Sequence, residues 1–223
     1  MKIIINSYIK GHIALKHLLD SFEENKIIDF YDIIVVIGGY YNINDYEISK
    51  KGGITYIHCN HNSIDFTGLI TLCELFFNDI HEHYLYLHDT CKIGKNFCHK
   101  LKAIDLTTIS SIKINKPFSM NMGIYSQQII NHFKDFLLST KNTNENNSMN
   151  FKINGVLVED YIFKHDKNNI ILGNYDSRNY KENTTGPTNY YNTGTLRKVE
   201  YYPNLDLFKI KANWGQKNWT LNN

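Results

Sequence analysis

The chain has 223 residues, and its 24 Lys and Arg against 22 Asp and Glu give a formal net charge of +2. This balance gives no electrostatic reason to expect nucleic acid or an anionic membrane as a partner, because either would call for a cluster of basic residues. Hydrophobic residues make up 42% of the chain, which is enough for a core. The length favours one domain over residues 1–223.

Two features predict a soluble cytoplasmic protein. No apolar stretch approaches the ~20 residues of a membrane-spanning helix, and the N-terminal run Ile3–Ile5 is too short for a signal peptide. The four cysteines form no CxxC pair and are too few for a disulfide scaffold of this size. We therefore expect no membrane insertion and a reducing compartment.

The first half of the chain alternates between strand-like and helix-like patterns. Such alternation with short links favours an α/β fold with a mainly parallel sheet flanked by helices. Ligands of such sheets bind at the carboxyl ends of the strands. The predicted strands are 2–6, 32–37, 54–59 and 84–87, and the predicted helices are 14–22 and 69–77.

The second half is less regular. Its predicted elements are a glycine-containing strand over 117–125, a helix over 127–138, an apolar segment over 156–163, and a closing hairpin of 199–202 and 205–210. Polar, Asn-rich stretches over 140–150 and 176–194 predict loops.

The sequence His88-Asp89-Thr90-Cys91 directly follows the buried run 84–87. A carboxylate at the end of a central strand is well placed to hold Mn²⁺ or Mg²⁺ against a diphosphate, because these ions share their coordination shell with phosphates and water. In the alternative interpretation, Asp89 caps the helix that follows. The strand-end position favours the metal.

Glu159 and Asp160 lie among apolar residues. Burial of a carboxylate raises its pKa towards the range of a general base. The alternative is an ordinary helix with one carboxylate facing water. Adjacent helical residues point about 100° apart, so at most one of the two faces a site.

The segment 61–68 separates a predicted strand from an apolar helix. Asn62, Ser63 and Asp65 can bind the hydroxyl groups of a ribose or sugar, and Gly68 allows close approach of backbone and ligand. Alternatively, Ser63 or Asp65 caps the next helix. The glycine of Asn121-Met122-Gly123, inside a predicted strand, also indicates close backbone approach.

Taken in order, these features resemble a GT-A type glycosyltransferase, with a Rossmann-like fold. The resemblance runs from Lys2 to about Phe163 and is carried by the strand–helix alternation, Asp89 at a fourth strand end, the NMG strand and the late Glu159-Asp160 pair. The segment 62–68 is similar to an Asp-Phe-Gly segment of some bacterial and viral polysaccharide glycosyltransferases. The small size is similar to that of glycosyltransferase domains of large DNA viruses, such as the chlorovirus capsid-glycan rhamnosyltransferase domain, which would place the protein in a host cytoplasm.

The resemblance implies transfer of a sugar from a nucleotide-sugar donor, such as UDP-glucose or UDP-rhamnose, to a hydroxyl of a glycan or glycoprotein. A nucleotide-binding half, about residues 1–100, would precede an acceptor-side half, about 101–223. The family's DxD motif is here Asp89-Thr90-Cys91 and lacks its second carboxylate. Asp89 would hold the metal, either alone or with help from His88 or His165, and the third alternative is a weak or absent metal. Asp160 would be the base of an inverting displacement, with Glu159 as the alternate. The donor would be bound by Asn6, Ser7, Tyr8, Gly38, Asn62, Asp65, His88, Asp89 and Asn121.

Two other functions compete with this one. A nucleotidylyltransferase would need a basic glycine-rich turn near the N-terminus, and the only candidates for it, Lys10 and Lys16, do not lie in one. A catalytically inactive carbohydrate- or nucleotide-binding protein of the same fold is favoured by the incomplete DxD motif, since fold does not fix function.

Overall fold

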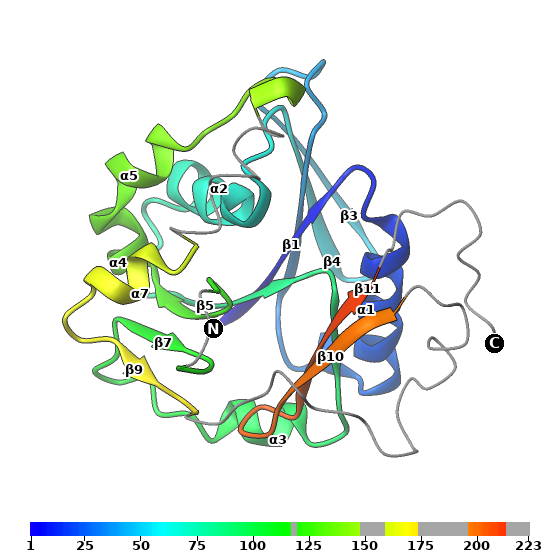
Figure 1. Cartoon of the computed structure of the whole chain (residues 1–223), viewed down its shortest axis with the longest axis vertical. Helices are drawn as coiled ribbons and strands as arrows, with labels where there is room; N and C mark the ends of the chain where they lie inside the picture. The colour runs from blue at the N-terminus through cyan, green and yellow to red at the C-terminus, as the bar shows by residue number, and fades with distance from the viewer. Residues whose placement is uncertain (117–119, 148–158, 174–195, 213–223) are drawn as a thin grey trace.

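A computed structural model describes residues 1–116, 120–147, 159–173 and 196–212. The described residues form a mixed α/β architecture with an eight-stranded sheet, flanked by helices, and a second sheet of three strands (Figure 1). Strands from before and after residue 100 hydrogen-bond to each other in both sheets. Among the described residues, no helix is long and apolar enough to cross a membrane.

The large sheet has the order β3-β4-β2-β1-β5-β8-β7-β9. Its central strands β4, β2, β1 and β5 are mutually parallel, whereas β3 and β8 run against their neighbours. The strands are β1 (Lys2–Tyr8), β2 (Ile33–Gly38), β3 (Tyr46–Lys51), β4 (Ile54–Cys59), β5 (His83–His88), β7 (Ser111–Lys113), β8 (Gly123–Ser126) and β9 (Ile170–Ile171). The small sheet contains β10 (Leu196–Tyr202), β11 (Leu207–Ala212) and β6 (Cys91–Ile93).

The helices lie on both faces of the large sheet (Figure 1). The helix α1 and the small sheet cover one face, and α2, α4, α5 and α7 cover the other. The α-helices are α1 (His12–Glu24), α2 (Thr67–Leu75), α3 (Phe97–Lys102), α4 (Gln127–His132), α5 (Lys134–Ser139) and α7 (Tyr161–His165), and short 3-10 turns occur at Ile27–Asp29 and Ile64–Phe66.

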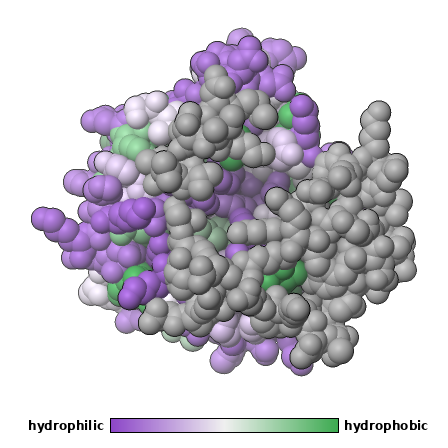
Figure 2. Space-filling model, in the orientation of Figure 1, coloured by the Kyte–Doolittle hydropathy of each residue, from purple (hydrophilic) through white to green (hydrophobic). Residues whose placement is uncertain are grey.

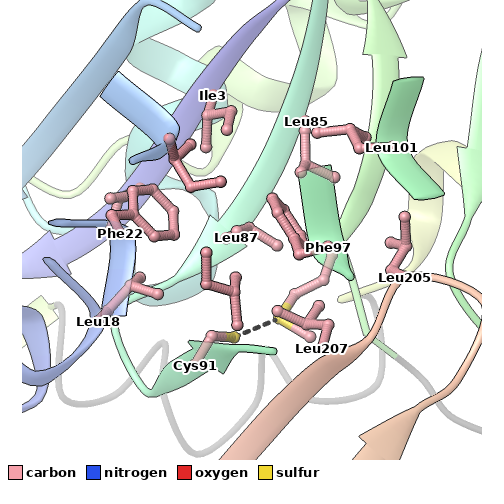
Figure 3. Packing of buried hydrophobic residues seen from close by; sticks show 14 of the residues in the cluster. Ile3, Leu18, Phe22, Leu85, Leu87, Cys91, Phe97, Leu101, Leu205 and Leu207 are labelled. Atoms are coloured by element: carbon pink, nitrogen blue, oxygen red, sulfur yellow. Dashed lines mark hydrogen bonds between the residues drawn. The ribbon is translucent and has the colours of Figure 1, made fainter. Parts of the chain in front are cut away.

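Alternating residues of the central strands supply two separate cores. Ile3 and Ile5 of β1 pack against α1 and the hairpin, and Ile4 between them packs against α2. Figure 3 shows the first core, where Phe22 of α1 and Phe97 of α3 stack with ring centroids 6.4 Å apart. Because both faces are covered, these strands contain consecutive apolar residues, such as Ile3–Ile5 and Ile33–Ile37, as expected for parallel strands.

The predicted elements of the first half are all present, with small shifts of their ends. The antiparallel strand β3 was not predicted, because its residues after Tyr46 are exposed and show no apolar pattern. The helix expected over 127–138 is divided into α4 and α5 at Phe133. The closing hairpin is confirmed as β10 and β11.

Parts of the other predictions lie outside the described residues. The loop expected over 176–194 lies wholly there, and so do the first residues of the segments 117–125 and 156–163. On the face seen in Figure 2, most of the described surface is hydrophilic, and the hydrophobic residues form small separate patches. That face offers no broad apolar surface among the described residues.

Candidate functional site at the carboxyl ends of β1 and β5

The chain order of the central strands creates a switch point between β1 and β5. From β1 the chain moves outward to β2 and β4, and it then returns through α2 to β5 on the other side of β1. In open α/β sheets, ligands bind at the carboxyl ends of the strands where the order reverses in this way. At this point the Ser7 hydroxyl donates a hydrogen bond of 2.7 Å to the Asp89 carboxylate.

The segment 62–68 is fixed to these strand ends by buried amide side chains. The Asn6 side chain donates to the Ile64 carbonyl at 2.9 Å and accepts from the Gly68 N–H at 2.8 Å. Asn62 accepts from the Ile64 N–H at 3.0 Å. These two residues were predicted to bind the donor, but in the structure their polar atoms bind the protein's own backbone.

Gly68 also serves the protein itself. A Cβ at Gly68 would lie 2.7 Å from the ring of Tyr86, so the close approach predicted there is to a buried side chain and not to a ligand. Gly38 behaves similarly, because a Cβ there would lie 2.8 Å from the His61 carbonyl oxygen. Neither Ser63 nor Asp65 caps α2, so that alternative is wrong.

The backbone of Ile64 is strained. Its φ is +54°, in the left-handed region that β-branched residues almost never adopt. Such strain costs of order 1–3 kcal/mol and persists only where the surroundings hold it. Here Asn6 and Asn62 hold both backbone polar groups of Ile64, and the next residue, Asp65, is thereby directed to the strand ends.

The hydrogen bonds around His88 define its tautomer. The Asn121 amide nitrogen donates to the Asp65 backbone carbonyl, which can only accept, so the Asn121 oxygen faces His88. That oxygen lies 2.7 Å from His88 Nε2, which must therefore carry the proton. The lone pair of the neutral imidazole is left on Nδ1, and the Asp65 carboxylate lies 3.5 Å from that atom.

Asp65, His88 and Glu159 form a cluster with the chemistry of a metal site. One ligand atom from each lies within 4.8 Å of the others. The imidazole favours Zn²⁺ or Fe²⁺ and the two carboxylates also suit Mn²⁺ or Mg²⁺, so all of these ions accept this set of ligands. His88 donates its other ring N–H to an amide carbonyl, as metal-binding histidines usually do. The residues present therefore fit a divalent cation.

Asp89 is not a member of this cluster. Its carboxylate is buried, which raises its pKa to about 6, while the hydrogen bond from Ser7 and the charge of Lys209 oppose the rise. The strand β6, not a helix, follows Asp89, so the capping alternative is also wrong. The group of possible metal ligands near this strand end therefore excludes Asp89 and consists of His88, Glu159 and Asp65, of which Asp65 was predicted only as a donor contact.

Asp160 lies in a different environment from Glu159. Its carboxylate is 3% exposed and binds the ammonium groups of Lys113 at 2.9 Å and Lys164 at 2.7 Å. Two cations stabilise the charged carboxylate, which weakens its ability to take a proton from a substrate. This geometry disfavours Asp160 as a general base and favours its neighbour Glu159 as the acidic residue of the site.

Lys209 is the main residue of the site that the sequence did not indicate. It lies in β11, opposite Cys91 of β6, and its ammonium binds His88 Nδ1. The register of a hairpin more than a hundred residues away from His88 determines this contact, so no local pattern could reveal it. Tyr8, by contrast, was predicted and remains 41% exposed at the end of β1.

Tyr40, Lys10 and Lys16 contact other side chains of the protein. Tyr40, which follows the end of β2, packs on His58 with ring centroids 4.5 Å apart. Lys10 and Lys16, the basic residues that a nucleotidylyltransferase would need, are exposed and bind Glu145 and Asp20. Neither lysine is directed at the strand ends by a glycine-rich turn, which disfavours that function.

The chain was compared with known proteins in three ways. No protein family, no curated protein and no solved structure matches it. The class defined by the fold is therefore an α/β protein with a large mixed sheet, compatible with a Rossmann-like arrangement.

Proposed function

We propose that the protein is a glycosyltransferase that uses a nucleotide-sugar donor, most simply a UDP-sugar, and a divalent cation. The observation that carries the proposal is the meeting of Asp65, His88 and Glu159 at the switch point between β1 and β5. A nucleotide diphosphate is a ligand class that such strand ends accommodate.

In this proposal Asp65, His88 and Glu159 hold the cation, which when bound neutralises the charge of the departing diphosphate. Asn121 orients His88, and Asn6 holds the segment that carries Asp65. Tyr8, exposed at the same edge of the sheet, provides an aromatic ring for the base. The acceptor is a glycan or glycoprotein hydroxyl.

The first experiment measures hydrolysis of a panel of UDP- and GDP-sugars with Mn²⁺ and no acceptor, because transferases leak donor to water. We expect nucleotide release from one donor, abolished by Glu159→Gln and by His88→Gln. Asp160→Asn is the matched comparison, since it changes the adjacent carboxylate. It should lower stability and leave turnover per folded molecule largely intact.

Three outcomes would change the proposal. If no donor is hydrolysed and no nucleotide raises the melting temperature, the protein lacks the donor site, because a ligand at a hundred times its Kd stabilises by about 2.7 kcal/mol. If nucleotides bind but no donor turns over, the catalytically inactive binding protein replaces the enzyme. If Asp160→Asn abolishes turnover and Glu159→Gln does not, Asp160 is the base and Glu159 is not needed to hold the cation.

A further inference from the structure

Lys209 is held close to the cation site by its backbone. The strand β11 pairs with β6, and the Ile210 N–H donates to the Thr90 carbonyl at 2.8 Å, directly after the end of β5. From this position the Lys209 ammonium reaches His88 Nδ1 and lies 3.9 Å from the Met122 sulfur.

The partners of this ammonium are unusual. Lys2, Lys113 and Lys141 each form an ion pair with a carboxylate. Lys209 forms none with any carboxylate that the structure describes, although its side chain is half-buried. Its one nitrogen acceptor is Nδ1 of the neutral His88 imidazole. The ammonium therefore hydrogen-bonds to the same lone pair that would bind a metal.

We propose that in the metal-free protein Lys209 occupies the His88 lone pair that the cluster would offer a metal, and that a divalent cation must displace it. The inference rests on the cation site of the proposed function. His88 Nε2 carries the proton that Asn121 accepts, so Nδ1 has one lone pair to offer. That lone pair cannot accept from an ammonium and coordinate a metal at the same time.

Competition of this kind lowers the affinity for the metal in two ways. The Lys209–His88 hydrogen bond must be broken, and a second positive charge repels the incoming ion. Both effects disappear when the ammonium is removed. Methionine at position 209 keeps an unbranched side chain of similar length and suits the neighbouring Met122 sulfur.

The test measures Mn²⁺ binding to the full chain by electron paramagnetic resonance and calorimetry, without any nucleotide. We expect Lys209→Met to bind Mn²⁺ about 10- to 100-fold more tightly than the wild type, the range typical of groups that contact a metal ligand. His88→Gln should lose most of the affinity. Lys209→Gln is a second variant, in case the methionine variant does not fold.

Lys92→Met is the matched control. Lys92 lies on β6, next to Cys91 and opposite Phe208 of β11, so its loss removes the same charge from the adjoining strand without touching His88. It should leave Mn²⁺ affinity within about threefold of the wild type, the effect left to a screened charge. An equal gain in both variants would show a general charge effect and overturn the competition.

Nitrogen NMR of the histidine rings adds a readout that does not depend on activity. In the metal-free wild type, His88 should be the Nε2–H tautomer, and Lys209→Met should shift the Nδ1 signal. Unchanged or weaker Mn²⁺ binding in Lys209→Met would overturn the inference, and so would Mn²⁺ binding to neither protein. Tighter Mn²⁺ binding in Lys209→Met with no turnover of any donor would support the inference and overturn only the glycosyltransferase function.

Discussion

His61 should make the protein sensitive to acid. The side chain is fully buried next to the edge of the Tyr46 ring, with centroids 5.8 Å apart, and neither ring nitrogen makes a hydrogen bond of normal geometry. Burial, followed by the charge of Lys141, lowers its pKa to about 4, although Glu74, the backbone of Thr67 and Asp45 act in the opposite direction. The perturbation is His61→Phe, which keeps a ring and removes the titrating group.

The size of the stability loss follows from the difference in the pKa of His61 between the folded and the unfolded state. The unfolded histidine titrates near 6.5 and the folded one near 4, so between these values the unfolded state binds more protons and stability falls as the pH falls. From pH 7.5 to pH 4.5 the loss due to His61 is about 2–3 kcal/mol. The His61→Phe variant should lack this part of the loss.

The assay is urea unfolding of the wild type and the variant at several pH values from 7.5 to 4.5. We expect the variant to gain about 2–3 kcal/mol relative to the wild type over this range. His81→Phe is the control for the exchange of a histidine for a phenylalanine, because His81 is exposed. If the free energy of unfolding falls equally with pH in the His61 variant and in the wild type, His61 is not a buried, neutral side chain in the folded protein.

Three further predictions concern the scaffold, and urea unfolding at pH 7.5 tests each of them. Lys113→Met should cost about 3 kcal/mol, because it leaves a buried carboxylate without its buried partner, whereas Lys164→Met, at a half-exposed position, should cost less than about 1 kcal/mol; equal costs would contradict the assigned burial. Gly68→Ala should cost about 1–3 kcal/mol, since the new methyl group meets the buried Tyr86 ring, and an unchanged midpoint would refute that contact. Asn121→Ala should cost about 1–3 kcal/mol through the loss of two buried hydrogen bonds, and a smaller loss than in an exposed Asn→Ala variant would exclude the bridging role.

The sequence predicted the parallel half of the sheet well because its strands are covered on both faces. Continuous apolar runs such as 33–38 and 84–87 have few other uses in a soluble protein. The strands β6, β7 and β9 have two or three residues each, too few for any period to appear. They exist because longer neighbouring strands offer them hydrogen bonds.

The site was predicted in part, and the reason lies in the two uses of a polar side chain. At the end of a buried strand, Asn6 can bind a ligand or tie down a loop, and the residue type is the same in both cases. Only the geometry shows that Asn6 binds the Ile64 carbonyl and the Gly68 N–H. Asp160 is similar, since Lys113 lies 47 residues away in the sequence.

These assignments restrict how a donor can be recognised. Both ends of the Asn6 and Asn121 amides already bind the protein, so a sugar hydroxyl could use them only by breaking these hydrogen bonds. Asp65 and Tyr8 are described side chains that keep exposed surface at the strand ends. With a cation held at Asp65 and a base stacked on Tyr8, the site would favour a nucleotide diphosphate over a neutral glycan as the tightly bound partner. We therefore expect the free nucleotide diphosphate to bind more tightly than the free sugar, and equal affinities in calorimetry would contradict this order.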